Sequence, residues 1–223
     1  SQERSIGVGA LGFHAYLQKS KLPFESALAK SANMRMFKHI KRELDSANSE
    51  LAAKRGPCPD AAKSGLNLRF SHTMAVAPNA SSSLIMGNTS PSIEPYRANV
   101  FRQDTLSGAS VHKNRFLDKI LQEKCSQLGL DVGEVWASII ANDGSVQHLD
   151  WLEDDVRDVY KTAVEIDQRW IIELAADRQE FIDQGQSVNV FFRPDVNVKY
   201  LHAIHFMAWK QDLKSLYYCR SDK

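Results

Sequence analysis

Long helical patterns alternate with short apolar runs along this chain, and this alternation constrains the fold more than any other feature. The longest pattern runs from about Glu25 to Arg55, where apolar residues recur every three or four positions, and Gly56 followed by Pro57 ends it. Further helices are predicted over residues 114–128, 154–184 and 198–213, and buried strands over residues 6–13, 73–76, 187–192 and 215–219. Helices that alternate with short strands indicate parallel strands joined by helical crossovers, which is an α/β fold.

The number of strands limits what such a sheet can become. About four strands are too few to close a barrel, because a barrel of around eight strands already has only a packed interior. The sequence therefore predicts an open, incomplete sheet with an exposed edge. Neither an internal repeat nor a long linker divides the chain, so residues 1–223 are expected to belong to one domain.

Composition and scattered ligand-type residues exclude several classes of protein. The net charge is +1 and no basic stretch is interleaved with aromatic residues, so nucleic-acid binding is not expected. Apolar runs fall short of the roughly 18 residues of a membrane span, so no membrane association is expected either. His202 and His205 lack an evident third metal ligand. Cys58, Cys125 and Cys219 are too few and too scattered for a disulfide scaffold or a zinc motif, which favours a cytoplasmic protein without a bound metal.

Two stretches with glycine could be mistaken for nucleotide-binding loops, and both are interpreted as structural. The loop Gly87–Pro95 lacks the Lys-Ser/Thr ending of a P-loop. Gly7, Gly9 and Gly12 lack the clear βαβ context of a dinucleotide motif, so close packing of strands explains them better.

The stretch Ala77–Ile85 follows a predicted strand and opens a short predicted helix. Free N–H groups at the start of a helix carry partial positive charge and suit a phosphate group. The alternative is an ordinary helix cap, in which Asn79 or Ser81 satisfies these N–H groups and binds nothing. The pattern alone favours the cap.

Two adjacent tyrosines, Tyr217 and Tyr218, close the run that begins at His205. On a regular strand, successive side chains point to opposite faces, so one ring would lie in the core and the other at the surface. Tyrosine commonly supplies apolar area with a hydrogen-bonding tip. Taken alone, the pair is therefore interpreted as structural.

The whole run from His205 to Tyr218 nevertheless resembles the end of the barrel in the large subunit of class I ribonucleotide reductase. Other blocks of the chain resemble the same family in the same order, and they are Arg4–Gly12, Leu51–Pro59, Ala77–Ser83, Gly87–Pro95, Asn142–Ser145 and Arg178–Ser187. The resemblance covers nearly the whole chain. It implies that residues 1–223 are the C-terminal part of a ten-stranded α/β barrel, with roughly its last four strands, incomplete on its own.

The resemblance also implies two sites. Tyr217 and Tyr218 would relay a radical by coupled loss of an electron and a proton, which suits a phenol because its O–H group is both donor and acceptor. The substrate diphosphate would be held mainly by backbone amides of the turn, at Ala80, Ser81, Ser82 and Ser83.

The implied reaction converts ribonucleoside diphosphates to deoxyribonucleoside diphosphates by radical chemistry. The chain would bind no cofactor itself, because a di-metal, tyrosyl-radical centre belongs to the small subunit. A separate N-terminal part of the large subunit would supply the thiyl and redox cysteines and the sites for ATP and deoxynucleotide effectors. A thioredoxin or glutaredoxin system would supply reducing equivalents. Some phage genomes encode this subunit in two pieces, and the chain looks like such a piece, although a truncated chain fits equally well.

Two alternatives come from other classes of protein. One is a helical interaction module without catalysis, which would not explain the Pro78 turn or the tyrosine pair. The other is an unrelated phosphate-binding transferase that uses the turn around Ser81. It would need its own nucleophile or base, and the sequence offers none that is convincingly placed.

Overall fold

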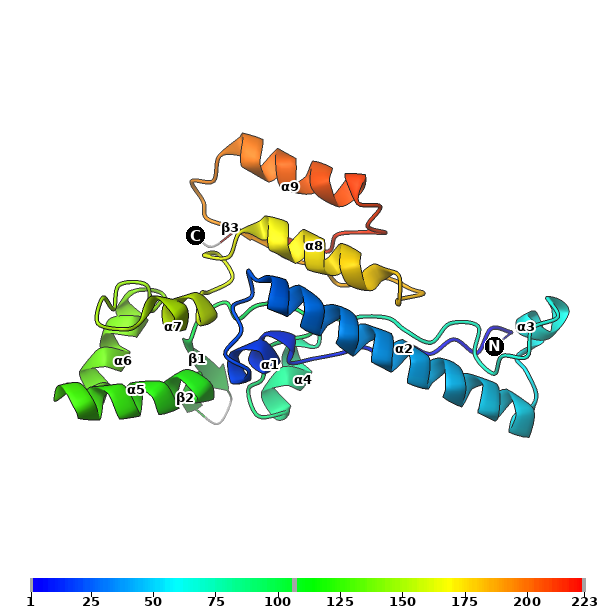
Figure 1. Cartoon of the computed structure of the whole chain (residues 1–223), viewed down its shortest axis with the longest axis horizontal. Coiled ribbons are helices and arrows are strands. Elements are labelled where there is room, and N and C mark those ends of the chain that lie inside the picture. Colours follow the sequence, from blue (N-terminus) through cyan, green and yellow to red (C-terminus); the bar gives the residue numbers. More distant parts are fainter. Residues whose placement is uncertain (1, 106–107, 222–223) are drawn as a thin grey trace. The chain divides into compact units, whose positions relative to one another are not determined.

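The structure is a computed structural model that describes residues 2–105 and 108–221. In chain order its elements are α1 (Phe13–Lys19), α2 (Ala27–Arg55), α3 (Pro59–Lys63), α4 (Ala80–Ile85), β1 (Val100–Thr105), β2 (Gly108–Lys113), α5 (Arg115–Leu128), α6 (Val132–Ala141), α7 (Asp154–Val159), α8 (Gln168–Gln179), β3 (Val190–Phe192), α9 (Val198–Lys210) and β4 (Cys219–Ser221), as Figure 1 shows. Within the described residues, no helix is both long and apolar enough to cross a membrane.

The chain forms two compact units, which are described separately. The first unit comprises Ser1–Ala10, Ala27–Pro78 and Gln168–Lys223, and the second comprises Leu11–Ser26 and Asn79–Asp167. The expectation that residues 1–223 belong to one domain stays a prediction.

A row of parallel segments is the centre of the first unit. Val8 pairs with Met74, Val76 pairs with Gln186, and β3 pairs with β4, each in parallel. Backbone hydrogen bonds link these pairs, for example from Val8 N to Thr73 O (2.8 Å) and from Ser187 N to Val76 O (2.8 Å). The described segments therefore lie in the order 6–8, 72–76, 184–192 and 217–221. This arrangement confirms the predicted parallel sheet of about four segments, although only β3 and β4 are regular strands.

Close approach of two of these segments explains the early glycines. A Cβ atom added to Gly9 would lie 2.6 Å from the carbonyl oxygen of Ala75, which is backbone and cannot move aside. A Cβ atom on Gly7 would lie 3.1 Å from the Cβ atom of Ala75. The interpretation of these two glycines as packing residues is confirmed, since glycine in a strand often marks close backbone approach.

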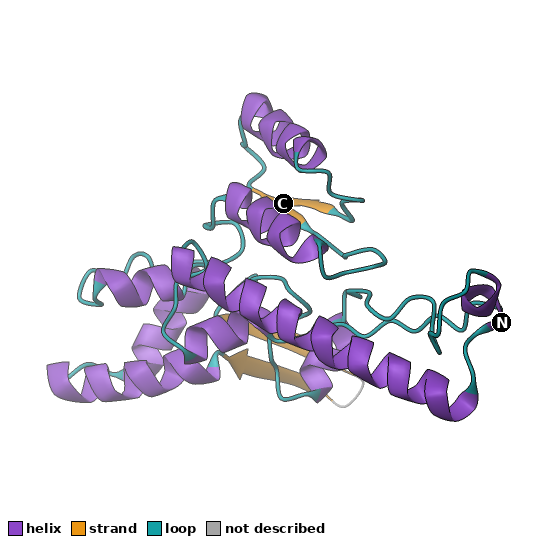
Figure 2. Ribbon diagram, turned by 45° about the vertical axis from the view of Figure 1, so that its right-hand side comes forward, coloured by secondary structure: helices purple, strands orange, loops and turns teal. Residues whose placement is uncertain are grey.

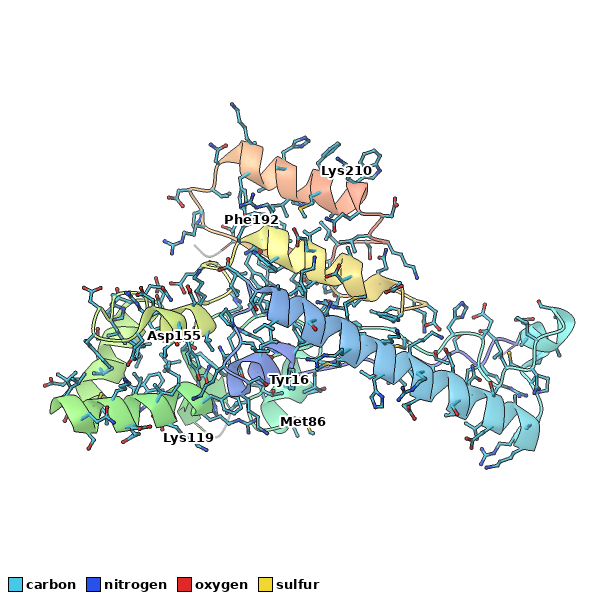
Figure 3. The ribbon with its side chains drawn as sticks, viewed as in Figure 1. Tyr16, Met86, Lys119, Asp155, Phe192 and Lys210 are labelled. Atoms are coloured by element: carbon cyan, nitrogen blue, oxygen red, sulfur yellow. The ribbon has the colours of Figure 1, made fainter. Side chains whose placement is uncertain are left out.

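Three helices of the first unit pack in succession. Helix α8 contacts both α2 and α9 (Figure 1), and Figure 2 shows β3 and β4, in orange, next to α8. Asn33 of α2 donates from its side-chain amide to Leu174 O of α8 (2.9 Å) and accepts from Arg178 Nε (2.8 Å). Burial lowers the pKa of Arg178 to about 9, so this guanidinium remains largely charged near neutral pH. Phe192 of β3, which is labelled in Figure 3, packs against the ring of His205 on α9 (centroids 6.5 Å apart).

The second unit combines a hairpin with short helices around its own core. β1 and β2 pair antiparallel, with Val100 opposite Lys113. The side chain of Asn114 caps α5 by accepting from the backbone N–H groups of Phe116 and Leu117, and Gly129 ends the helix in a left-handed conformation. Trp136 lies in the core between the helices and donates from Nε1 to Asp118 Oδ1 (2.9 Å).

The sequence prediction differs from the structure at several elements. The single helix predicted over 154–184 is two helices, α7 and α8. It breaks because the Glu165 carboxylate accepts from Thr162 N (2.8 Å) and Thr162 Oγ1 (2.9 Å), which fixes a turn at this point. The hairpin β1–β2 and the helices α3 and α6 were not predicted. The last regular strand begins at Cys219 and not at the predicted residue 215, because Tyr218 N donates to the Asn189 side chain and regular pairing starts only at Val190 and Cys219.

Candidate functional site

The turn at the start of α4 presents backbone N–H groups at the surface of the second unit. Asn79 precedes the helix in a left-handed conformation (φ 53°) and makes no side-chain capping hydrogen bond. Ala80, Ser81 and Ser82 are exposed, and the first N–H groups of a helix have no acceptor within it. The Asn79 cap that the sequence offered as an alternative is therefore absent from this turn.

Ser83 differs from the three residues before it. Its N–H donates to Asn79 O (3.0 Å), its hydroxyl donates to Ala80 O (2.7 Å), and its side chain is buried. Its donors are thus engaged within the turn, and the amides of Ala80, Ser81 and Ser82 remain as the exposed part of the predicted site.

The loop after α4 is hydrogen-bonded to the turn and to the start of α1. Thr89 N donates to Ser83 O (3.1 Å), and Ser90 and Ser92 are buried. Ser90 accepts through its carbonyl from Gly12 N (2.8 Å) and through its hydroxyl from Ala15 N (3.1 Å). The loop is thus fixed by hydrogen bonds to α4 and to the start of α1, which supports its interpretation as structural. Met86, directly after α4, extends into solvent (Figure 3).

The tyrosine pair lies at the surface of the first unit, immediately before β4. The ring centroids of Tyr217 and Tyr218 are 4.1 Å apart and their planes meet at 52°. Tyr217 is 52% exposed and Tyr218 is 48% exposed, so neither ring is a core residue. The arrangement of one ring inside and one outside, which a regular strand would give, is wrong for this segment.

Two neighbouring side chains, Tyr218 and Arg220, influence the phenol of Tyr217. Hydrogen bonding with the Tyr218 side chain raises the pKa of Tyr217 above its ordinary value, and the charge on Arg220 opposes this shift. The guanidinium of Arg220 lies 4.8 Å from the ring centroid of Tyr218, within the range of a cation–π contact. The two phenol rings, in contact beside a cation, therefore place two oxidisable groups side by side at the surface.

The two histidines of α9 do not form a site together. His205 stacks on Phe192 and contacts Leu201 O through Nδ1 (2.8 Å), whereas His202 stacks on Phe206 (6.1 Å). Among the described residues, no group of three or more His, Cys, Asp or Glu side chains could hold a metal ion. Structural roles account for both rings.

Sequence reasoning missed two residues that contact the tyrosine pair. Arg220 was detectable, because a residue two positions after Tyr218 on a strand points to the same face. Asn189 accepts from Tyr218 N through Oδ1 (3.0 Å), and no local pattern indicates this contact, because 29 positions separate the two residues.

The row of parallel segments agrees with the family comparison. The model of the ribonucleotide reductase barrel domain matches residues 1–67 and 60–219. The chain therefore belongs to the ribonucleotide reductase barrel-domain family, and its fold is part of that α/β barrel.

Three relatives show which subunit of this enzyme the chain resembles. The chain is 50% identical to the ribonucleoside-diphosphate reductase large subunit of Invertebrate iridescent virus 6, over 100% of this chain and 23% of the relative. It is 50% identical to the corresponding subunit of Invertebrate iridescent virus 3, over 99% of this chain and 35% of the relative. Its structure matches the Actinobacillus ureae class Id ribonucleotide reductase alpha subunit with a TM-score of 0.89 at 40% identity, over 100% of this chain and 40% of that one. The chain thus spans about a quarter to two fifths of these relatives and corresponds to a piece of the large subunit.

Proposed function

We propose that this chain supplies part of the catalytic barrel of a ribonucleoside-diphosphate reductase, and that Tyr217 and Tyr218 carry the radical relay. The observation that carries the proposal is the contact of two half-exposed phenol rings at 4.1 Å in a chain of this family. Neither a non-catalytic helical module nor an unrelated transferase accounts for the family match together with this pair.

Each tyrosine of the relay would return to its starting state after every turnover. A phenol loses one electron and one proton to become a neutral radical, and it regains both from the next group in the relay. The contact between the two rings supports this step, because their centroids lie 4.1 Å apart for the electron and each phenol O–H group can donate or accept a hydrogen bond for the proton. The net reaction is separate: the 2′-hydroxyl group leaves as water while a dithiol is oxidised to a disulfide.

The proposal assigns the remaining parts of the reaction to partners. A small subunit with a di-metal, tyrosyl-radical centre would donate the radical, and the rest of the large subunit would supply the reactive cysteines and the sites for ATP and deoxynucleotide effectors. A thioredoxin or glutaredoxin system would restore the dithiol. The chain itself would bind no metal and would act in the cytoplasm.

The turn at α4 is proposed to bind the substrate diphosphate. The support is the exposure of its first three residues and its place in the part of the chain that the family model matches, within the stretch Ala77–Ser83 that resembles the family. Backbone amides can hold an anion whatever the side chain, so Ala80 is compatible with this role.

Replacing Ser82 with proline tests this assignment. Ser82→Pro removes one exposed N–H group and should weaken binding of a ribonucleoside diphosphate by about ten- to a hundredfold, because a hydrogen bond to a charged group contributes about 1.5–3 kcal/mol. Ser81→Ala is the matched control and should cost less, since it keeps the amide. Calorimetric titration of the assembled enzyme gives both affinities. Equal affinity of Ser82→Pro and the parent protein, with folding intact, would refute the site.

The outer segments of the parallel row lead to a prediction about assembly. In the described part of the chain, segments 6–8 and 217–220 each pair with a neighbouring segment on one side only, and an outer backbone edge of this kind favours pairing with another chain. The isolated chain is therefore expected to be oligomeric or poorly soluble and to reduce no nucleotide. Native mass spectrometry and a turnover assay check this. Turnover by the chain with only the small subunit and reductant would contradict it.

A further inference from the structure

The hydrogen bonds beside the tyrosine pair depart from a regular parallel ladder. In a regular ladder, a single residue donates its N–H to one residue of the neighbouring strand and accepts through its C=O from the residue two positions further on. Here Tyr217 donates from N to Val188 O (2.8 Å), whereas Tyr218 is the residue whose O accepts from Val190 N (3.0 Å). Tyr217 and Tyr218 therefore both lie opposite a single residue of the neighbouring segment, Asn189. An extra residue of this kind in one of two paired strands defines a β-bulge.

The bulge explains why the two rings meet. Side chains of successive strand residues normally point to opposite faces. An extra residue disrupts the alternation locally, and Tyr217 and Tyr218 instead lie with ring centroids 4.1 Å apart and similar exposure. Beyond the bulge the ladder is regular again, with Val190 paired to Cys219.

A bulge also leaves one backbone N–H without a ladder partner, and here that group belongs to Tyr218. Asn189 satisfies it, because its side-chain Oδ1 accepts from Tyr218 N at 3.0 Å. Asn189 is 1% exposed, so its side chain has a fixed position from which to hold the extra residue. A partly buried N–H group without such an acceptor would be costly, and the segment would gain by shifting into the regular register.

We propose that Asn189 is a positioning residue that stabilises the bulge and thereby keeps Tyr217 and Tyr218 in contact for radical transfer. This inference deepens the proposed function of the tyrosine pair and rests on it. Asn189 touches neither substrate nor radical in this role. It acts through the backbone of Tyr218.

The test compares Asn189→Leu with Asn189→Asp in the assembled enzyme. Leucine has a similar size but no acceptor, so kcat should fall at least tenfold while KM for the diphosphate stays within about twofold. Aspartate keeps an acceptor oxygen at the same position and should retain more of the kcat. Ser187→Ala, a buried change two residues away whose hydroxyl has no hydrogen-bond partner among the described residues, is the matched control and should leave kcat unchanged.

A second readout does not depend on turnover. The pKa of Tyr217, measured by NMR titration of ¹³C-labelled tyrosine and assigned with Tyr217→Phe, should move back toward its ordinary value in Asn189→Leu, because the contact with Tyr218 is lost. It should stay raised in Asn189→Asp and Ser187→Ala.

The outcomes separate this inference from the proposed function. If Tyr217→Phe is inactive while Asn189→Leu keeps full kcat, the relay stands and the role of Asn189 is wrong. If the tyrosine variants remain active, the relay is wrong, and an unchanged Tyr217 titration in Asn189→Leu overturns the bulge as well. If Asn189→Leu does not fold, the test rests on Asn189→Asp, which should retain much of the parent kcat. The inference is contradicted if the Tyr217 pKa in Asn189→Asp equals that of the parent protein while kcat is as low as that of Tyr217→Phe.

Discussion

Replacing Tyr217 or Tyr218 with phenylalanine is expected to reduce the formation of deoxyribonucleoside diphosphate to background. Each change removes one hydroxyl group and keeps nearly all of the ring, so packing should survive. Phenylalanine has no phenolic proton to lose with its electron, so it is far harder to oxidise and the relay stops. Steady-state product formation by the reconstituted complex measures the effect.

The controls for this prediction are substrate affinity, assembly with both partners and stability. All three should change little, because both rings are half exposed and the loss of one hydrogen bond costs about 0.5–1.5 kcal/mol. Tyr16→Phe, a change at another exposed tyrosine, should keep full activity. If Tyr217→Phe and Tyr218→Phe both retain more than a small fraction of the parent activity, the relay assignment is wrong.

The largest effect on stability is expected from Trp136→Ala in the second unit. Trp136 is 2% exposed within the core of the helices, and its ring N–H donates to Asp118. Truncation leaves a cavity and removes the hydrogen bond, so the free energy of unfolding should fall by about 3–5 kcal/mol. Thermal unfolding of the assembled protein, followed by circular dichroism at a fixed concentration, should show a clearly lower midpoint.

Trp209→Ala is the matched control for that change. Trp209 is 72% exposed on α9, so the same truncation should lower the free energy of unfolding by less than about 1 kcal/mol. Equal shifts in the two variants would contradict the assignment of Trp136 to the core of its unit.

Local patterns in the sequence were sufficient to predict the main helices and the parallel arrangement. The helix predicted over 25–55 is α2, and the apolar runs near Val8, Met74 and Val190 are segments of one parallel row. Periodicity failed between α7 and α8, because Tyr160 and Ala163 continue the apolar spacing although the Glu165 carboxylate holds the backbone in a turn.

The candidate site was predictable only in its residue types. The motif placed an amide turn at Ala80–Ser83 and a tyrosine pair at Tyr217 and Tyr218, but it could not show that the Ser83 donors are used within the turn. The contact between the two rings depends on a bulge opposite Asn189, and a bulge is set by hydrogen bonds between segments far apart in the chain. Such a register is a tertiary property that no local pattern contains.

The most direct test of the central claim is to look for the radical at the tyrosine pair. 3-Aminotyrosine in place of Tyr217 is easier to oxidise than tyrosine and should trap the radical as it passes. With the complete large subunit, the small subunit and a ribonucleoside diphosphate present, electron paramagnetic resonance should show an aminotyrosyl radical that forms as the radical of the small subunit disappears. If the complex assembles and binds substrate but no radical forms at position 217, the chain does not carry the relay and the account is wrong.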